Sequence, residues 1–584
     1  MRSLPSAVVL AGLLVGGGGA AQGQPRASGD DGVAVRSLYV PMRDGVRIAV
    51  DVALPAGLSP LRKLPALLKI SRFGRAPRDG SVADEDRFWV EHGFARVLID
   101  ERGTGASFGT SRYGTATIPD LADLVGWIVA QPWSDGKVGA IGVSVEGTAA
   151  ELLAATGRPE VAAVAPWFSD YDYYTDLVRP GGVYNEWLLT HLAAFTARMD
   201  GGEAAKPVDG DHDGALLQAA LSEHRGNVDI AVATRRGVFA DDQLPGVRRT
   251  LRELSTPGVA RELRRARVPM LILVSWFDAG TVQGALARFR TFANPQDVYI
   301  GAWSHGGGFD ADPFDAAGTP VEPTKERQRL MALDFFSRLL KGSTWPRRIH
   351  YYTVGEGAWH ESPSWPPAGL RPETLHLGAD GSLAARARGG ARPVPLTVTS
   401  TGEANRWHTQ LGGHAVRYAE VLDRMAELPA YTTAPLASGL EITGQPILRL
   451  RLSCGARDPA VFAYLLAVDP RGRAFYLTEG QLRLVDRKLA PSEPTLHTYR
   501  RQDAAPVLEG RTFAADVTLL PISAWLPPGF RLRLALAAGD ASTFERAEEY
   551  QAAIDAASTL VLPARRRPAS RATPWPGPGG GNLR

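Results

Sequence analysis

The segment Val138-Gly139-Ala140-Ile141-Gly142-Val143-Ser144-Val145-Glu146-Gly147 decides the fold class. An apolar strand pattern precedes the serine, a helical pattern follows it, and small residues flank the turn between them. Such a turn lets strand and helix approach closely and pushes the serine hydroxyl outward, as in a nucleophile elbow. The usual motif has glycine two positions after the serine, where this chain has Glu146 and then Gly147. The alternative is an ordinary buried serine in a strand-to-helix turn.

Short apolar runs alternate with helical patterns on both sides of this segment. The strand candidates are 64–70, 94–100, 138–142, 161–165, 270–275 and 298–302, and the helix candidates are 84–92, 119–131 and 145–156. A hairpin with its turn at 43–45 precedes them. Because strands and helices alternate, we predict the α/β class with a mostly parallel sheet.

Two further regions differ from this pattern. Strand signals vanish between about 169 and 268, where helical segments such as 214–223 and 243–254 take over, so we expect an inserted helical cap. Beyond Trp345 many short strands are separated by Gly, Pro and Asp turns, which favours a β-sandwich. The expected domains are an α/β core at 35–168 and 269–370, a helical cap at 169–268 and a β-sandwich at 371–563.

The N-terminus has the pattern of an export signal. Residues 1–23 combine an early arginine, a short apolar run and a region of small residues, which predicts a secreted or periplasmic protein. The alternative is an uncleaved amphipathic start. No segment reaches the roughly twenty apolar residues of a transmembrane helix, so no membrane span is expected. Cys454 is the only cysteine, which excludes a disulfide framework.

Composition and charge exclude some classes of function. The chain is 44% hydrophobic and 22% charged, a mixture typical of globular proteins, and 584 residues are enough for several domains. The formal net charge is +3, and the segment 564–584 holds five arginines, so the folded body is nearly neutral. This argues against nucleic acid as a partner. The segment itself mixes Arg with Pro and Gly and is expected to be a disordered basic tail.

A serine hydroxyl needs a histidine base and a carboxylate that orients the base. Asp278 follows the strand candidate 270–275, and His305 follows the candidate 298–302. Because parallel strands end at one sheet edge, we predict that Ser144, Asp278 and His305 meet there. The chain order Ser, Asp, His is that of the α/β-hydrolase fold. The alternatives are a turn or helix-cap role for Asp278 and a backbone-bonded loop position for His305.

Most of the chain beyond residue 23 resembles the cocaine esterase and X-Pro dipeptidyl-peptidase family. The matching phrases are VPMRDGVR at 40–47, DERGTGAS at 100–107, WSDGKVG at 133–139, WFD at 276–278, WSH at 303–305, ITGQP at 442–446 and PGFRL at 528–532. The resemblance implies an α/β-hydrolase core with an inserted helical cap and a C-terminal jelly roll of galactose-binding-like type. It places Ser144, Asp278 and His305 on the family's catalytic triad and implies a serine hydrolase that cleaves carboxylic esters.

The resemblance also raises a question about the oxyanion hole. The family commonly has a tyrosine in the loop after the third strand, and its hydroxyl stabilises the oxyanion; the matching residue here is Phe73. The backbone N–H of Val145 remains as one donor. Losing one donor typically costs about a hundred- to thousand-fold in turnover. Either a substitute such as Ser71 or a water molecule supplies the second donor, or the enzyme is slow.

Aromatic residues near two of the strand ends suggest a substrate pocket. The residues predicted to line an apolar acyl pocket are Trp167, Phe168, Tyr171, Tyr173, Tyr174, Trp187, Trp276 and Phe277. The alternative is that half of them belong to the core. Relatives that act on α-amino acid esters hold the substrate ammonium with acids soon after the triad aspartate, whereas Ala279-Gly280-Thr281 follow Asp278 here. This weakens two alternatives, an X-Pro dipeptidyl-peptidase and an α-amino acid ester hydrolase or amidase.

The expected partner is a small-molecule ester or amide, with no cofactor and no metal. The phrase DGDHDG at 209–214 mimics the start of a calcium loop, but Ala220 stands where the loop needs Glu. We therefore expect Asp213 to cap a helix beginning at Gly214. A non-catalytic binding protein would explain Phe73, but the retained Ser, Asp and His argue against it. The sequence carries no signal for an oligomeric state.

Overall fold

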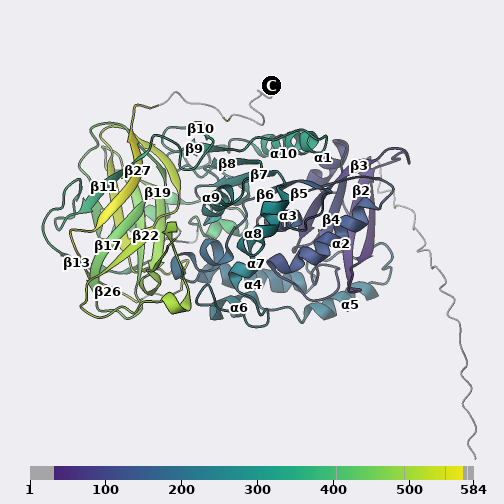
Figure 1. Ribbon diagram of the computed structural model, residues 1–584, viewed down its shortest axis with the longest axis horizontal. Coiled ribbons are helices and arrows are strands. Elements are labelled where there is room, and N and C mark those ends of the chain that lie inside the picture. The colour runs from purple at the N-terminus through teal and green to yellow at the C-terminus, as the bar shows by residue number, and fades with distance from the viewer. Residues whose placement is uncertain (1–31, 403, 492, 546–547, 570–574, 576–584) are drawn as a thin grey trace, which may run out of the picture.

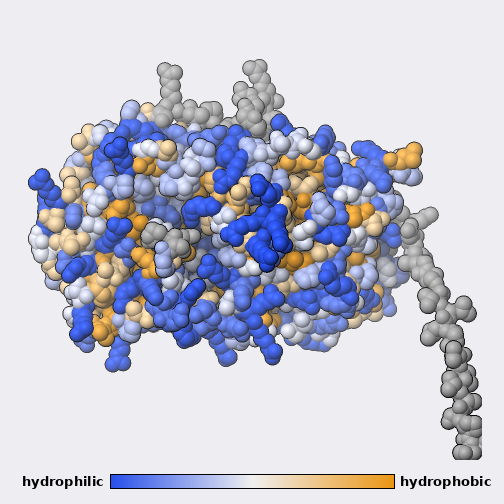
Figure 2. Space-filling model, viewed as in Figure 1, coloured by the Kyte–Doolittle hydropathy of each residue, from blue (hydrophilic) through white to orange (hydrophobic). Residues whose placement is uncertain are grey.

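The computed structural model describes residues 32–402, 404–491, 493–545, 548–569 and 575. The predicted export signal at 1–23 lies outside these residues, as does most of the predicted tail. Figure 1 shows an α/β body, coloured purple to teal, beside a body of antiparallel sheets coloured green to yellow. On the face shown in Figure 2, hydrophobic residues are scattered among a majority of hydrophilic ones.

The α/β body is built on a ten-stranded sheet. Its strands are β1 (Val33–Pro41), β2 (Arg47–Pro55), β3 (Leu64–Ser71), β4 (Ala95–Asp100), β5 (Ser134–Val143), β6 (Val161–Trp167), β7 (Met270–Ser275), β8 (Gln296–Gly301), β9 (Arg348–Thr353) and β10 (Ala358–Ser362). They lie in the order β1-β2-β4-β3-β5-β6-β7-β8-β9-β10, in which β3 to β9 are parallel. Every residue of β7 is buried, as expected for a strand covered on both faces. The α/β-hydrolase fold class is confirmed.

Helices cover both faces of this sheet (Figure 1). They are α1 (Asp84–Glu91), α2 (Ile118–Val129), α3 (Val145–Ala154), α9 (Thr281–Thr291) and α10 (Lys325–Leu339), with the 3-10 turns η1 (Gly114–Thr117) and η5 (His305–Gly307). The three helices predicted from the pattern agree with α1, α2 and α3 within a few residues. Pro119 and Asp120 lie in the first turn of α2. In this turn a residue without a backbone N–H loses no helical hydrogen bond, and a negative charge interacts favourably with the helix dipole.

Between β6 and β7 the chain forms only helices and turns over residues 168–269. These are η2 (Tyr174–Val178), η3 (Pro180–Gly182), α4 (Glu186–Asp200), α5 (Ala215–His224), α6 (Ile230–Arg236), α7 (Leu251–Leu254), η4 (Thr256–Val259) and α8 (Ala260–Ala266). The helix predicted at 243–254 is wrong except for its last turn. A capping box between Thr250 and Glu253 starts a new helix at Leu251, so the preceding residues form turns.

The cap of α5 also differs from the expectation. Asp211 accepts hydrogen bonds from the backbone N–H groups of Leu216 and Leu217 at 3.0 and 2.8 Å. Asp213 accepts only from Ala215, at 3.1 Å. Asp211 is therefore the main capping carboxylate, because its side chain reaches back over the first turn.

The second body consists of mainly antiparallel sheets, apart from the short parallel pair β14–β25, and of a few short helices. Its strands are β11 (Arg371–Leu377), β12 (Leu383–Ala384), β13 (Arg392–Leu396), β14 (Val398–Thr399), β15 (Ala430–Thr432), β16 (Leu440–Gly444), β17 (Ile447–Cys454), β18 (Ala460–Val468), β19 (Ala474–Arg483), β20 (Leu489–Ala490), β21 (Glu493–His497), β22 (Phe513–Thr518), β23 (Ile522–Leu526), β24 (Arg531–Ala537), β25 (Gly539–Asp540), β26 (Tyr550–Ile554) and β27 (Thr559–Arg566), and its helices are η6 (His408–Gln410), α11 (Tyr418–Met425), η7 (Leu484–Asp486) and η8 (Arg501–Asp503). Alternate residues of β17 are buried, the pattern of a strand with one solvent face.

The prediction of a disordered tail over 564–584 is wrong for its first residues, which belong to the fold. Strand β27 continues to Arg566, and the arginines at its end have carboxylate partners. Arg565 pairs with Glu441 at 2.9 Å, and Arg567 pairs with both Glu441 and Glu356. Because partners on neighbouring strands neutralise these charges, the segment up to residue 569 is part of the fold.

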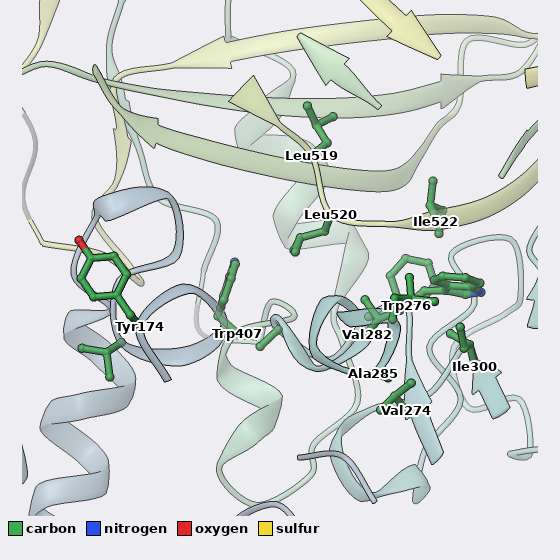
Figure 3. Close-up of a cluster of buried hydrophobic side chains, with 14 of the residues drawn as sticks. Tyr174, Val274, Trp276, Val282, Ala285, Ile300, Trp407, Leu519, Leu520 and Ile522 are labelled. Carbon is green, nitrogen blue, oxygen red and sulfur yellow. The ribbon is translucent and has the colours of Figure 1, made fainter. Parts of the chain in front are cut away.

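The two bodies share one hydrophobic core. Figure 3 shows Leu520 and Ile522 of the antiparallel body lying over Trp276 and Val282 of the α/β body. Arg406, which is 2% exposed, donates Nη2 hydrogen bonds to the carbonyls of Trp276 and Ala279 at 2.5 and 2.8 Å. The Ala279 N–H donates back to the Arg406 carbonyl at 3.2 Å. A buried cation thus fixes the loop that follows β7.

We expect Arg406→Met to lower the midpoint of thermal unfolding by several degrees, because two buried carbonyls lose a charged donor worth about 2 kcal/mol in total. Scanning calorimetry measures this midpoint. The matched control is Arg417→Met, whose side chain is 57% exposed and which should leave the midpoint unchanged. Equal midpoints for both variants would contradict the role of Arg406.

Candidate active site

Ser144 lies in a strained turn between β5 and α3. Its backbone has φ 62° and ψ −127°, an unfavourable conformation for any residue but glycine. The Ser144 N–H donates to the Trp167 carbonyl, and the Ser144 carbonyl accepts from Thr148, each at 2.9 Å. A Cβ at Gly142 would lie 2.4 Å from the backbone of Glu146, and one at Gly147 would lie 2.7 Å from the Trp167 oxygen. The glycine pattern in the sequence therefore reflects the close approach of β5 and α3.

His305 and Asp278 form a buried hydrogen-bonded pair. The Nδ1 of His305 lies 2.9 and 3.0 Å from the two carboxylate oxygens of Asp278. The Thr281 hydroxyl donates to Asp278 Oδ2 at 3.0 Å, which holds the carboxylate in place at the start of α9. Because Nδ1–H donates to the carboxylate, the neutral ring presents Nε2 as a proton acceptor.

Ser144 and His305 open on the same cavity, which has a volume of about 970 Å³. His305 Nε2 is buried and has no hydrogen-bond partner among the described residues. Val145 and Phe73 also line this cavity. Three loops that are distant in the sequence are thus brought to one edge of the sheet, where Ser144 and His305 line one cavity.

The cavity has a polar part that sequence reasoning missed. Asp170 and Glu101, from the loops after β6 and β4, line it, and burial raises the pKa of each to about 7. The Asp170 Oδ1 atom has no hydrogen-bond partner in the described part of the chain. Burial lowers the pKa of His305, but the charge and hydrogen bond of Asp278 and the charge of Asp170 outweigh it, so the pKa is raised overall.

The two residues expected at the oxyanion hole, Val145 and Phe73, both line the cavity. Val145 is the first residue of α3, where backbone N–H groups have no intrahelical acceptor and the helix favours negative charge. The Phe73 ring packs against Phe195 with centroids 4.9 Å apart and offers no hydroxyl. Ser71 is 1% exposed, lies outside the cavity wall and accepts the Phe73 N–H at 3.1 Å. Ser71 therefore does not replace the missing donor.

Of the eight aromatic residues predicted to line the acyl pocket, only Tyr173 lies in the wall of the cavity in the described structure, which corrects the prediction for the other seven. Trp276 packs against Trp365 with centroids 5.8 Å apart, and Phe277 packs against Tyr418 at 6.0 Å. Tyr171 bonds Thr291 at 3.3 Å, and Trp167 is buried at the end of β6. Trp276 and Phe277 turn into the interface with the antiparallel body, a contact that local sequence patterns do not reveal.

Helix α4 supplies much of the cavity wall instead. Leu188, Leu192 and Phe195 line it and are spaced by four and three residues, the spacing of one helix face. Tyr173 and the segment 410–413 of the antiparallel body complete the wall. The α4 spacing is a signal that could have been found in the sequence, whereas the contribution of 410–413 depends on how the two bodies pack.

Within the described residues, no group of three His, Cys, Asp or Glu side chains is arranged as a metal site. Every helix in the described part of the chain is too short or too polar to cross a bilayer.

Comparison with known proteins relates both bodies to known families. Residues 44–307 match the X-Pro dipeptidyl-peptidase (S15 family), and residues 340–562 match the X-Pro dipeptidyl-peptidase C-terminal non-catalytic domain. A protein of Mycobacterium bovis, provisionally named a serine esterase, is 34% identical over 88% of this chain and 91% of its own. The cocaine esterase of Rhodococcus sp. is 26% identical over 87% and 91%.

Solved structures show the same fold. An α-amino acid ester hydrolase superposes with a TM-score of 0.72 at 18% identity, over 93% of this chain and 98% of that one. A CocE/NonD family hydrolase from Staphylococcus aureus superposes with a TM-score of 0.69 at 17% identity, over 91% and 94%. Fold and relatives together define a serine hydrolase of the α/β-hydrolase class. More specifically, the chain belongs to the X-Pro dipeptidyl-peptidase (S15) family.

The pKa of His305 is raised, so we expect the acidic limb of the kcat/KM profile of this serine hydrolase to lie above the ordinary histidine pKa of 6.5. Asp170→Asn removes one of the charges that raise this pKa, so the limb should move to lower pH. The control is Glu146→Gln, which removes a cavity carboxylate that lies 3.8 Å from Lys69. An unchanged limb in Asp170→Asn would refute the coupling.

Proposed function

We propose that this serine hydrolase cleaves carboxylic esters through an acyl-enzyme on Ser144, with His305 as general base and Asp278 as the group that orients it. The observation that carries the proposal is the His305–Asp278 pair at 2.9 Å, with Nε2 left unpartnered in the described structure at the cavity that Ser144 lines. The proposed substrate is a small molecule, because a cavity of about 970 Å³ has the size of a small-ligand site.

The reaction proceeds in two steps. The Ser144 Oγ attacks the ester carbonyl carbon while its proton passes to His305 Nε2, and the developing oxyanion accepts the Val145 N–H. His305 then gives the proton to the leaving alkoxide, which departs as an alcohol. In the second step His305 takes a proton from water, the hydroxide attacks the acyl carbon, and the released Ser144 oxygen regains the proton as the carboxylic acid leaves.

Two observations favour an ester over a peptide substrate. The two relatives with names of esterases match nearly the whole chain. The residues after Asp278 carry no carboxylate: Ala279 bonds Arg406, and Gly280 lies so close to Asp176 that a Cβ would be 2.5 Å from its carbonyl oxygen.

A second candidate function is release of an N-terminal Xaa-Pro dipeptide or cleavage of an α-amino acid ester. The family match favours it, and so does the unpartnered Asp170 carboxylate oxygen in the cavity, which could face a substrate amine.

We also propose that residues 1–23 direct export and that the mature protein is secreted or periplasmic. The charge and the apolar run of this segment support the proposal.

A fluorophosphonate probe should label the wild-type enzyme and fail to label Ser144→Ala, and this variant should lose at least about 10³-fold in ester turnover. Ser222→Ala, an exposed serine on α5, is the control and should be labelled normally. Labelling of Ser144→Ala would place the nucleophile elsewhere. Comparing p-nitrophenyl acyl esters with Xaa-Pro p-nitroanilides then decides between the two candidate functions, and a preference for the anilides would overturn the esterase proposal.

Phe73→Tyr should raise kcat about tenfold or more, because the added hydroxyl would supply a second donor to the oxyanion. Steady-state kinetics with one ester suffices. Phe513→Tyr, which adds a hydroxyl to a half-buried ring on β22 outside the cavity wall, serves as the control and should leave kcat unchanged. If Phe73→Tyr gives no gain, position 73 does not face the oxyanion.

A further inference from the structure

The cavity follows one face of α3 away from the nucleophile. Val145, Thr148, Ala149 and Leu152 line it, and they are spaced by three and four residues along the helix. From Ser144 to Leu152 the helix rises about 12 Å at 1.5 Å per residue. The cavity therefore extends for about two helical turns beyond the serine hydroxyl.

Apolar residues from several elements of the region between β6 and β7 form much of the wall opposite α3, together with polar residues such as Thr196 and Thr234. Figure 1 shows α4 and α7 together on one side of α3. The apolar lining residues of this region are Leu177, Val178, Leu188, Leu189, Leu192, Ala194, Phe195, Ile230, Leu251 and Leu254. Five of these ten are buried although they border an open space, so half of this apolar lining is a pre-formed surface rather than an exposed one. Such a lining favours an apolar ligand group.

The mechanism of ester cleavage indicates which part of the cavity holds the alcohol group of the ester and which part holds the acyl group. His305 protonates the leaving oxygen, so the alcohol group must lie on the His305 side, where Phe309, Lys325 and Gly413 line the cavity. Phe309 is 50% exposed, which marks this side as the more open one. The acyl group is attached to Ser144 and points away from His305, which leaves it the enclosed space beside α3.

The polar groups of the cavity are compatible with an apolar acyl group. Arg72 is paired with Asp200 at 3.1 Å, and Glu146 with Lys69 at 3.8 Å. Asp170 and Glu101 are buried enough for their neutral acid forms to be populated near neutral pH. The part beside α3 is therefore not dominated by an uncompensated charge.

We infer that the space beside α3 is an acyl-chain pocket and that the substrates are esters of medium- to long-chain aliphatic acids. The inference rests on the proposed ester hydrolase function and adds the class of the acyl group. An acetyl group would fill only the part of the pocket next to Ser144 and would leave the surface at Ala149 and Leu152 uncovered.

The test compares kcat/KM for p-nitrophenyl acetate, butyrate, octanoate and decanoate at concentrations below micelle formation. We expect a rise of about fourfold per added methylene until the pocket is full, which corresponds to about 0.8 kcal/mol per buried methylene. Ratios between substrates measured on one preparation do not depend on the fraction of folded enzyme.

Two variants locate the pocket. Ala149→Leu narrows it one turn beyond Val145 and should lower the octanoate-to-acetate ratio at least tenfold, whereas Leu189→Ala widens it and should shift the optimum to longer chains. Ala197→Leu, at an exposed position of α4 outside this cavity wall, should keep the wild-type ratios.

The outcomes separate the two proposals. Hydrolysis that depends on Ser144 but does not rise with chain length, or a ratio unchanged by Ala149→Leu, would overturn the acyl-chain pocket and leave the ester hydrolase standing. A failure to hydrolyse any ester of the series, or a preference for Xaa-Pro anilides, would overturn the proposed function together with the inference.

Discussion

The strained backbone of Ser144 is the constraint on which the site depends. A non-glycine residue at φ 62° costs about 1–3 kcal/mol, and such a conformation persists only where the surrounding structure enforces it. Here the enforcement comes from the close packing of β5, α3 and β6, which Gly142 and Gly147 permit. The same packing places Ser144 and the first residues of α3 in the wall of the cavity, at a helix N-terminus that favours negative charge.

The antiparallel body braces the loops that carry the other two residues. Arg406 bonds the loop around Asp278, and the Ser304 hydroxyl, next to His305, donates to the Gly413 carbonyl at 3.0 Å. Residues 410–413 also line the cavity. The part of the chain that matches the C-terminal domain thus contacts the loops of both Asp278 and His305 and holds these loops in a fixed relative position.

The sequence predicted what depends on local pattern and on general sheet geometry. The βα alternation, the elbow and the approach of His305 to Asp278 follow because parallel strands end at one edge. Contacts between distant segments could not be predicted. Trp276 and Phe277 have the composition of pocket residues but pack against the antiparallel body, and the segment 564–569 has the composition of a disordered tail but finds carboxylate partners at Glu441 and Glu356. The helix predicted over 243–254 is also wrong for most of its length, because the capping box at Thr250 starts the helix only at Leu251.

The apolar cavity and the loss of the hydroxyl at Phe73 affect different kinetic constants. Contacts between an aliphatic chain and the wall beside α3 are the same in the ground state and in the transition state, so they lower KM without raising kcat. A hydrogen bond to the oxyanion forms fully only in the transition state and therefore raises kcat. Under the proposed mechanism, an extended apolar wall and Val145 as the main oxyanion donor therefore predict an enzyme that binds its substrate tightly at low concentration and turns it over slowly.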